Sequence, residues 1–241
     1  MIFGPRVMHP RYAVYFAPHD GSSLWQLGCS WLGRDPQRDC ALEQPSLPGF
    51  THARIADVTA APRVYGFHAT LKAPFALDDG CAAADLHAAL AAFARQRTPF
   101  PLPRLEVGML GGFIALRPVS ASSALDALAR DCVVELDRWR APPHADELAR
   151  RRAASLSARQ EAMLARYGYA YVLDEFRFHL TLTDRMPGHE AQSLRELLAE
   201  HFTDALRQRL AVDSICLFVQ ERPGVPFTLA RRYDFLAVSR S

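Results

Sequence analysis

Two short strings, GFHATLK over residues 66–72 and RFHLTLT over residues 177–183, each hold a histidine and a threonine two positions apart. An imidazole has a pKa of about 6.5, so it can accept or donate a proton at neutral pH. A hydroxyl two residues further on can donate a hydrogen bond to a phosphate oxygen and stabilise developing charge. The spacing therefore indicates acid–base chemistry at a phosphate ester. The residues to which we assign this chemistry are His68, Thr70, His179 and Thr181.

Each string is expected to lie in a β-strand, the first over residues 64–75 and the second over residues 176–184. Side chains alternate between the two faces of a strand, so the polar and apolar residues of each string separate onto opposite faces. The apolar rows are expected to pack beneath helices, and the polar rows are expected to face a cleft. The polar rows are His68, Thr70 and Lys72 in the first strand and His179, Thr181 and Thr183 in the second.

Four further side chains are candidates for binding the substrate. Lys72 is the single lysine of the chain, beside 27 arginines, so we expect it to serve as a phosphate-binding cation. Thr183 continues the second polar row, and Arg185 lies just beyond it. Tyr15 belongs to a strand predicted over residues 11–17 and could reach the floor of the cleft. The alternatives that stay open are a solvated strand end for Lys72 and simple packing for Tyr15.

The segment of residues 146–167 is rich in arginine and is predicted to be helical in two pieces. Its run Arg150-Arg151-Arg152 is most simply a helix face in contact with solvent. The alternative is a flap that brings positive charge over a bound substrate.

The elements that must position these residues recur in the two halves of the chain. Each string is followed by a predicted helix, over residues 86–97 and 190–206, and then by a predicted hairpin. The hairpin turns contain Gly112 and Pro223, and each lies 44 positions beyond the histidine of its own half. We therefore predict an α+β fold with two pseudo-symmetric lobes, in which antiparallel sheets face a central cleft and helices lie outside. The alternative is a single continuous α/β sheet, although the hairpins count against a purely parallel one.

This bilobal domain is expected to span residues 1–241, with lobes of roughly residues 1–120 and 121–241 that can exchange strands. Before the first string, residues 35–62 are rich in proline, glycine and polar side chains. We predict an ordered loop there, with a short strand near residues 53–58.

Composition and charge argue against several classes of function. The net charge of +2 argues against a protein that neutralises long nucleic acids, which would carry a basic surplus. The five cysteines form no C-x-x-C pair, which argues against a disulfide framework and fits a reducing cytoplasm. No apolar run approaches the roughly 20 residues that span a bilayer. The expected location is therefore the cytoplasm, without membrane attachment.

Sequence strings that are typical of metal and nucleotide sites are absent. No H-x-H or H-E-x-x-H string occurs, so neither a metal nor another cofactor is expected. The strings G-x-x-x-x-G-K-[ST] and G-x-G-x-x-G are absent too, so nucleotide binding of those kinds is not supported. The expected partner is a small phosphorylated substrate, and the oligomeric state stays open.

The paired strings FHATL and FHLTL resemble those of the two-histidine phosphoesterase superfamily, which includes cyclic nucleotide phosphodiesterases and bacterial RNA 2′-5′ ligase-like proteins. The segments YAVYFAP, WLGRD, YGFHATLKAPF and FHLTLTDRM are similar to a branch found with bacterial phosphonate-degradation genes. The resemblance implies a bilobal fold, no metal, and a catalytic role for the two histidines and two threonines. Asp184 departs from the glycine that this resemblance leads us to expect before Arg185.

On these grounds we predict a metal-independent hydrolase that opens a small cyclic phosphate ester. The resemblance points to a phosphorylated ribose that carries a cyclic phosphate, in phosphonate catabolism. One histidine would activate water, and the other would protonate the departing sugar oxygen. The alternatives are an RNA-end 2′,3′-cyclic phosphodiesterase, a 2′-5′ RNA ligase-like enzyme, and a non-catalytic module that binds phosphorylated metabolites. The charge and the lack of an evident basic stacking platform count against the RNA alternatives.

Overall fold

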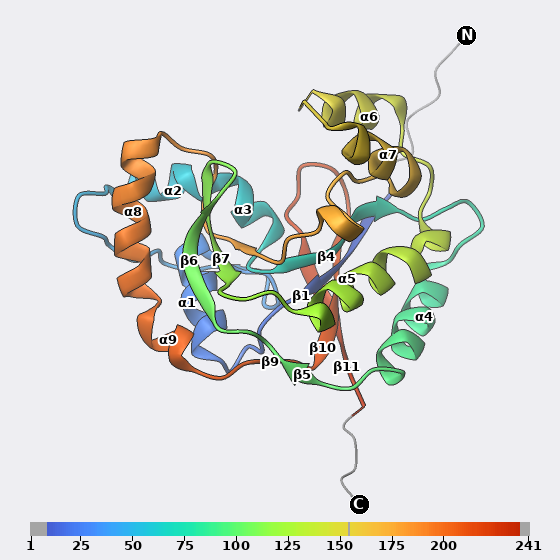
Figure 1. Ribbon diagram of the computed structural model, residues 1–241, viewed down its shortest axis with the longest axis horizontal. Helices are drawn as coiled ribbons and strands as arrows, with labels where there is room; N and C mark the ends of the chain where they lie inside the picture. The colour runs from blue at the N-terminus through green and yellow to red at the C-terminus, as the bar shows by residue number, and fades with distance from the viewer. Residues whose placement is uncertain (1–8, 154, 237–241) are drawn as a thin grey trace, which may run out of the picture.

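The computed structural model describes residues 9–153 and 155–236, and its main feature is a seven-stranded sheet (Figure 1). The strands of this sheet are β1 (Arg11–Phe16), β4 (Ala69–Ala76), β6 (Leu105–Leu110), β7 (Phe113–Pro118), β8 (Leu180–Thr181), β10 (Ser214–Gln220) and β11 (Thr228–Asp234). They lie in the order β11-β10-β1-β4-β8-β7-β6, and all neighbours are antiparallel. Two small sheets pair β2 (Arg34–Asp35) with β3 (Cys40–Ala41) and β5 (Phe100–Pro101) with β9 (Ala211–Val212).

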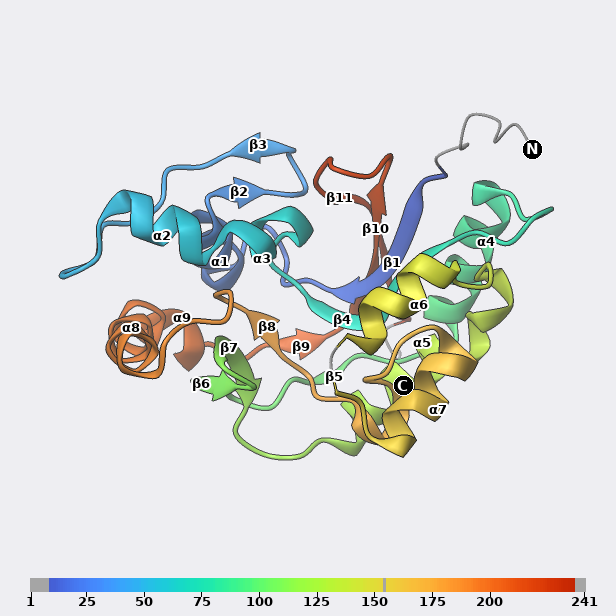
Figure 2. The same cartoon turned by 90° about the horizontal axis from the view of Figure 1, so that it is seen from above.

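Helices gather at both ends of this sheet. The α-helices are α1 (Ser23–Leu32), α2 (His52–Val58), α3 (Ala60–Tyr65), α4 (Ala83–Arg95), α5 (Ser123–Glu135), α6 (Ala145–Arg152), α7 (Ala158–Tyr167), α8 (Gly188–His201) and α9 (Thr203–Arg207). Figures 1 and 2 show α1, α2, α3, α8 and α9 at one end of the molecule and α4 to α7 at the other. Helices and antiparallel strands together confirm the predicted α+β class. Within the described stretches, no helix combines the length and the apolar character needed to cross a membrane.

The main sheet is continuous, but it is narrow at its middle. The two-residue strand β8 pairs with β4 only through Leu180 and Ala69, and with β7 through two pairs. The prediction had two separate sheets that face each other, whereas hydrogen bonds through β8 join the strands into one sheet. The hairpin β6–β7 lies beside β8, and the hairpin β10–β11 lies beside β1 on the far side of β4.

The segment before the first string differs most from its prediction. The predicted strand near residues 53–58 is wrong, because these residues form the helix α2. Thr51 caps this helix with its side chain, which accepts a hydrogen bond from the backbone N–H of Arg54. The helix buries Ile55 and Val58, which are three positions apart and so share one helix face.

The two predicted strands are both shorter than the sequence indicates. The helix α3 ends at Gly66, whose φ of +81° suits glycine, so β4 begins only at Ala69. In the second string only Leu180 and Thr181 make strand pairs. The predicted apolar rows are nevertheless confirmed as core. Their buried members are Phe67, Ala69, Leu71, Phe178, Leu180 and Leu182.

Candidate functional site

At the narrow middle of the sheet, the histidine of each string lies across from the threonine of the other string. Ala69 and Leu180 are paired, and the strands are antiparallel. Continuing this register by one residue each way sets two pairs opposite each other, His68 with Thr181 and Thr70 with His179. Cβ atoms of directly opposite residues lie about 4.5–5.5 Å apart. All four side chains line one cavity of ≈ 400 Å³, which we call the phosphate cleft.

The helix α1 holds both strings in place from beneath. Gly28 of α1 leaves room for the ring of Phe67, because a Cβ atom at this position would fall within 3.0 Å of that ring. Trp31, one turn further along α1, donates a hydrogen bond of 2.7 Å from Nε1 to the backbone carbonyl of Leu182. One rigid helix therefore sets the positions of residues directly next to His68 and Thr181.

Both imidazole rings are oriented in the same way by the backbone. Nδ1 of His68 lies 2.9 Å from the carbonyl oxygen of Gly66, and Nδ1 of His179 lies 2.7 Å from that of Arg177. A carbonyl oxygen can only accept a hydrogen bond, so Nδ1 carries the proton in the neutral form of each ring. Nε2 is then free to accept a proton. In His68 this atom lies 3.1 Å from Oγ1 of Thr70.

Burial favours the neutral form of both imidazoles. It lowers the pKa of His68 to about 4; the carbonyl of Gly66 opposes this shift, and the nearby His179 adds to it. Burial also lowers the pKa of His179. The ring of Tyr15 stacks on His68, with the ring centroids 3.7 Å apart. Removing water from a ring disfavours its charged form, so Nε2 of each ring stays unprotonated.

The phosphate cleft also has a basic wall that the prediction left as an alternative. Its lining includes Arg11 from β1 and three residues of α6, Glu147, Arg150 and Arg151. Figure 2 shows α6 at the end of the molecule that also holds α4, α5 and α7. Arg151 is held by Glu147 at 2.6 Å and lies over the ring of Tyr169. Arg150 and Arg151 thus border the cleft, and a flap over a bound substrate stays a prediction.

Lys72 does not lie in the phosphate cleft, contrary to the predicted polar row. Strand β4 is bulged here, since Val14 and Tyr15 of β1 pair with Lys72 and Thr70, which leaves Leu71 as an extra residue. The bulge turns Lys72 away from the face of Thr70. Its side chain is 3% exposed.

The surroundings of Lys72 give it a structural role. Nζ donates hydrogen bonds to the carbonyl of Val133, at 3.3 Å, and to Asp137, at 3.2 Å. Asp137 also binds Arg140. A cation that is buried against this pair is not available to a substrate, so Lys72 is not among the contacts that we propose.

Of the other predicted contacts, Tyr15 lines the phosphate cleft, whereas Thr183 and Arg185 do not. Tyr15 lines the phosphate cleft beneath His68. Thr183 is buried, and its Oγ1 accepts a hydrogen bond from the backbone N–H of Ile114, which fixes β7 against the second string. Arg185 is exposed and lines a neighbouring cavity that also reaches His68 and Thr181. The structure thus leaves Arg185 within reach of a larger ligand.

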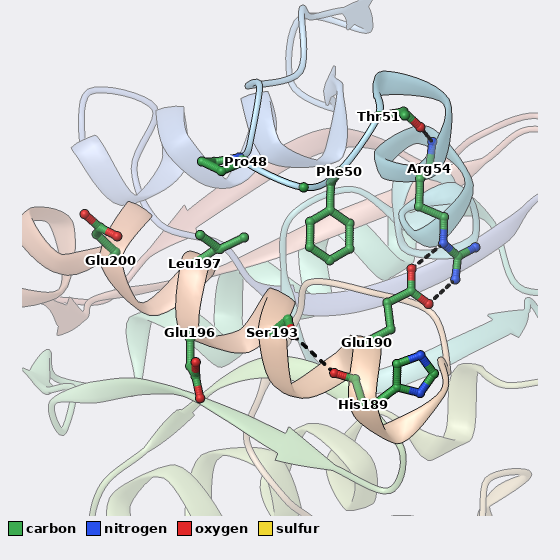
Figure 3. A pocket seen from close by; sticks show the side chains of 11 residues that line it. Pro48, Phe50, Thr51, Arg54, His189, Glu190, Ser193, Glu196, Leu197 and Glu200 are labelled. Carbon is green, nitrogen blue, oxygen red and sulfur yellow. Dashed lines mark hydrogen bonds and ion pairs between the residues drawn. The ribbon is translucent and has the colours of Figure 1, made fainter.

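A larger hollow of ≈ 760 Å³ between α2 and α8 is unsuited to a phosphate (Figure 3). Arg54 from α2 donates two hydrogen bonds to the carboxylate of Glu190 on α8, at 2.6 and 2.7 Å. The same guanidinium contacts Asp57. Glu196 and Glu200 also line this hollow, so its cation is occupied and its remaining charge is negative. In the part of the chain that the structure describes, no group of three or more His, Cys, Asp or Glu side chains could hold a metal ion.

The sequence predicts the basic wall only in part. The run of arginines in residues 150–152 was a visible signal, but its distance from the histidines depends on how α6 folds back over β4. Arg11 and Tyr169 carry no signal of their own, because each is one arginine or tyrosine among many.

Comparisons with known proteins give one family model and two curated relatives. A family model described as "Protein of unknown function (DUF1045)" matches residues 70–228. Two curated bacterial proteins, both named ribose 1,5-bisphosphate phosphokinase PhnN, are similar to the chain. The protein of Janthinobacterium sp. (strain Marseille) is 39% identical over 229 residues, which are 93% of this chain and 51% of that protein. The protein of Laribacter hongkongensis (strain HLHK9) is 41% identical over 222 residues, which are 92% and 51%. The chain therefore spans about half the length of these relatives.

These names contradict the predicted activity. They describe a phosphokinase, which transfers a phosphoryl group to an acceptor, whereas we predicted a hydrolase that opens a cyclic phosphate ester. The prediction of a cyclic phosphodiesterase is wrong on this comparison. The reason is chemical: histidines and threonines indicate acid–base work at a phosphate, but they do not specify whether water or another oxygen accepts the phosphoryl group.

Proposed function

This chain belongs to the DUF1045 family, and we propose that its phosphate cleft binds a phosphorylated ribose, the acceptor class for which its relatives are named. The observation that carries the proposal is that His68, Thr70, His179 and Thr181 line one cavity beside a basic wall. The sugar comes from the relatives, which are named for ribose 1,5-bisphosphate. Three arginines, Arg11, Arg150 and Arg151, line the cleft with one carboxylate, Glu147, so positive charge remains for a second phosphate.

Each group in the cleft has a separate task in this proposal. The hydroxyls of Thr70 and Thr181 donate hydrogen bonds to phosphate oxygens, which stabilises their negative charge. A bound phosphate favours the charged form of both imidazoles, so it raises the pKa of each from the lowered value that burial gives it. Nε2 of each protonated ring then donates a hydrogen bond to a phosphate oxygen.

The proposal covers the sugar-phosphate side of the reaction. The relatives are about twice as long as the part that the chain matches, and a G-x-x-x-x-G-K-[ST] string is absent from the chain. We therefore carry over the acceptor class named for them, and not their complete activity. A role in bacterial phosphonate catabolism, which the sequence resemblance implies, is part of the same proposal.

We also propose that the site lies between two pseudo-symmetric halves of one domain that exchange hairpins. Helix α4 follows β4 and packs against β11, whereas α8 follows β8 and packs against β6. Each helix thus packs against the hairpin strand of the other half. This crossed packing, together with the equal spacing of the two halves in the sequence, supports the symmetry.

Calorimetric titration with ribose 1,5-bisphosphate tests the proposed function. We expect one molecule to bind per chain, and His68→Ala and His179→Ala each to weaken binding by about 10-fold, as for a lost hydrogen bond to a charged group. His189→Ala is the matched control, because His189 lines the hollow beside α8. A wild-type protein that does not bind, or equal losses in all three variants, would refute the proposal.

A further inference from the structure

We infer that a second cavity, on the other side of His179, binds the planar base of a nucleotide whose phosphate lies among the histidines and threonines. This inference rests on the proposed function, because it takes the phosphate position from it. The cavity has a volume of ≈ 460 Å³ and shares Thr70 and His179 with the phosphate cleft. A ligand with a phosphate at His179 therefore has its next atoms at the mouth of this second cavity, which we call the aromatic cavity.

The walls of the aromatic cavity are mostly apolar, and β4 contributes Leu71 and Ala73 to them. The β6–β7 hairpin contributes Leu110 and Phe113, and α5 contributes Val133. The segment before β8 contributes Tyr169, Tyr171, Val172, Leu173 and Phe176. Small-molecule sites have this character, with apolar walls and a few polar groups that fix orientation.

Aromatic surface remains uncovered in this cavity. Tyr171 is 45% exposed, although large apolar side chains of a folded protein are mostly covered. Phe113 and Phe176 are half-buried. Phe113 lies 5.6 Å from His179 between ring centroids, so the aromatic surface begins next to the phosphate position.

The segment that carries these aromatics is anchored. Asp174 forms a bidentate ion pair with Arg159 of α7, with its shortest distance 2.7 Å. Glu175 accepts a hydrogen bond from Gln160 at 2.9 Å. Leu173, between them, has a φ of +57°, a conformation that costs a bulky residue free energy and persists only where the surroundings fix it. These contacts fix the segment that forms this wall of the aromatic cavity.

A nucleotide fits this pair of cavities better than a sugar phosphate alone. Bases stack on aromatic side chains through faces that every base has. A sugar phosphate would fill the phosphate cleft and leave the aromatic cavity in contact with water.

Binding of AMP, ribose 5-phosphate and adenosine, each measured by calorimetry, tests the inference. We expect AMP to bind about 10-fold more tightly than ribose 5-phosphate, which carries the same phosphate without a base. Tyr171→Ala and Phe176→Ala should remove most of this advantage and leave the affinity for ribose 5-phosphate unchanged. Tyr171→Phe, which keeps the ring, should retain the advantage. Thermal melts of all variants verify that they fold.

Equal affinities of the wild-type protein for AMP and ribose 5-phosphate would overturn the inference, as would an AMP advantage that persists in both alanine variants. Adenosine that binds as tightly as AMP would also overturn it, because the phosphate then lies away from His179. Failure of the proposed function looks different: ribose 5-phosphate and ribose 1,5-bisphosphate then do not bind.

Discussion

The contact between Gly28 and Phe67 predicts that one methyl group in α1 disturbs a site on the opposite side of the sheet. Gly28 lies inside a helix with ordinary backbone angles, so alanine there should gain about 0.5–1 kcal/mol from helix propensity. Against this, the new Cβ would fall within 3.0 Å of a ring that is fully buried. Overpacking of a core costs about 1–3 kcal/mol. We therefore expect Gly28→Ala to lower the free energy of unfolding by about 1 kcal/mol.

For a chain of this size that loss corresponds to a fall in Tm of roughly 2–4 °C. A shift of Phe67 would relieve the clash with the new Cβ and would move His68 as well. The affinity for ribose 1,5-bisphosphate should therefore also fall. Gly188→Ala is the control, because a Cβ there meets nothing within 4 Å. Phe67→Leu should restore part of the affinity in the double variant, since the smaller side chain leaves room for the methyl group. A Gly28→Ala protein with a raised Tm and wild-type affinity would refute the proposed support of His68 by α1.

Three further outcomes are expected. Because the pKa of His68 is lowered to about 4 in the folded state, the unfolded chain binds its proton first as the pH falls. As the pH falls from 6.5 to 4, the free energy of unfolding should decrease by roughly 1–3 kcal/mol more in the wild-type protein than in His68→Leu, as measured by urea unfolding. An equal decrease with pH in both proteins would contradict this. Arg151→Ala should weaken the binding of ribose 1,5-bisphosphate by about 10-fold in calorimetry, and the loss should be larger at low salt than at high salt. Arg152→Ala, which removes an exposed ion pair with Glu161, should leave this binding unchanged. Lys72→Met should lower the free energy of unfolding by only roughly 1–2 kcal/mol, since Asp137 keeps its ion pair with Arg140. The affinity for ribose 1,5-bisphosphate should be unchanged, and a large loss of affinity would show that Lys72 contributes to the site.

The parts of the site that follow from local alternation were predictable from the sequence. His68 and Thr70 share a face because strand side chains alternate, and the buried Phe67 and Leu71 follow from the same rule. The antiparallel hairpins follow from their turns. Lys72 escaped this reasoning because a bulge adds one residue to β4, and the pairing partner that creates a bulge is not visible in a single strand.

Tertiary placement was not predictable in the same way. The helix α2 depends on a cap and on burial against distant elements, in a segment whose composition is typical of loops. The basic wall depends on how α6 returns over the cleft. The acceptor of the phosphoryl group has no residue signature at all, because acid–base groups serve water and sugar oxygens alike.

The most direct measurement of the central claim is the protonation of the two cleft histidines, followed by nitrogen-15 NMR as ribose 1,5-bisphosphate is added at pH 7. In the free protein we expect both rings to be neutral, with the proton on Nδ1. At saturation the Nε2 signals of His68 and His179 should move towards those of a protonated ring, while the signals of His189 stay in place. Signals of His68 and His179 that do not respond to a ligand that binds would contradict the claim that this cleft is the phosphate site.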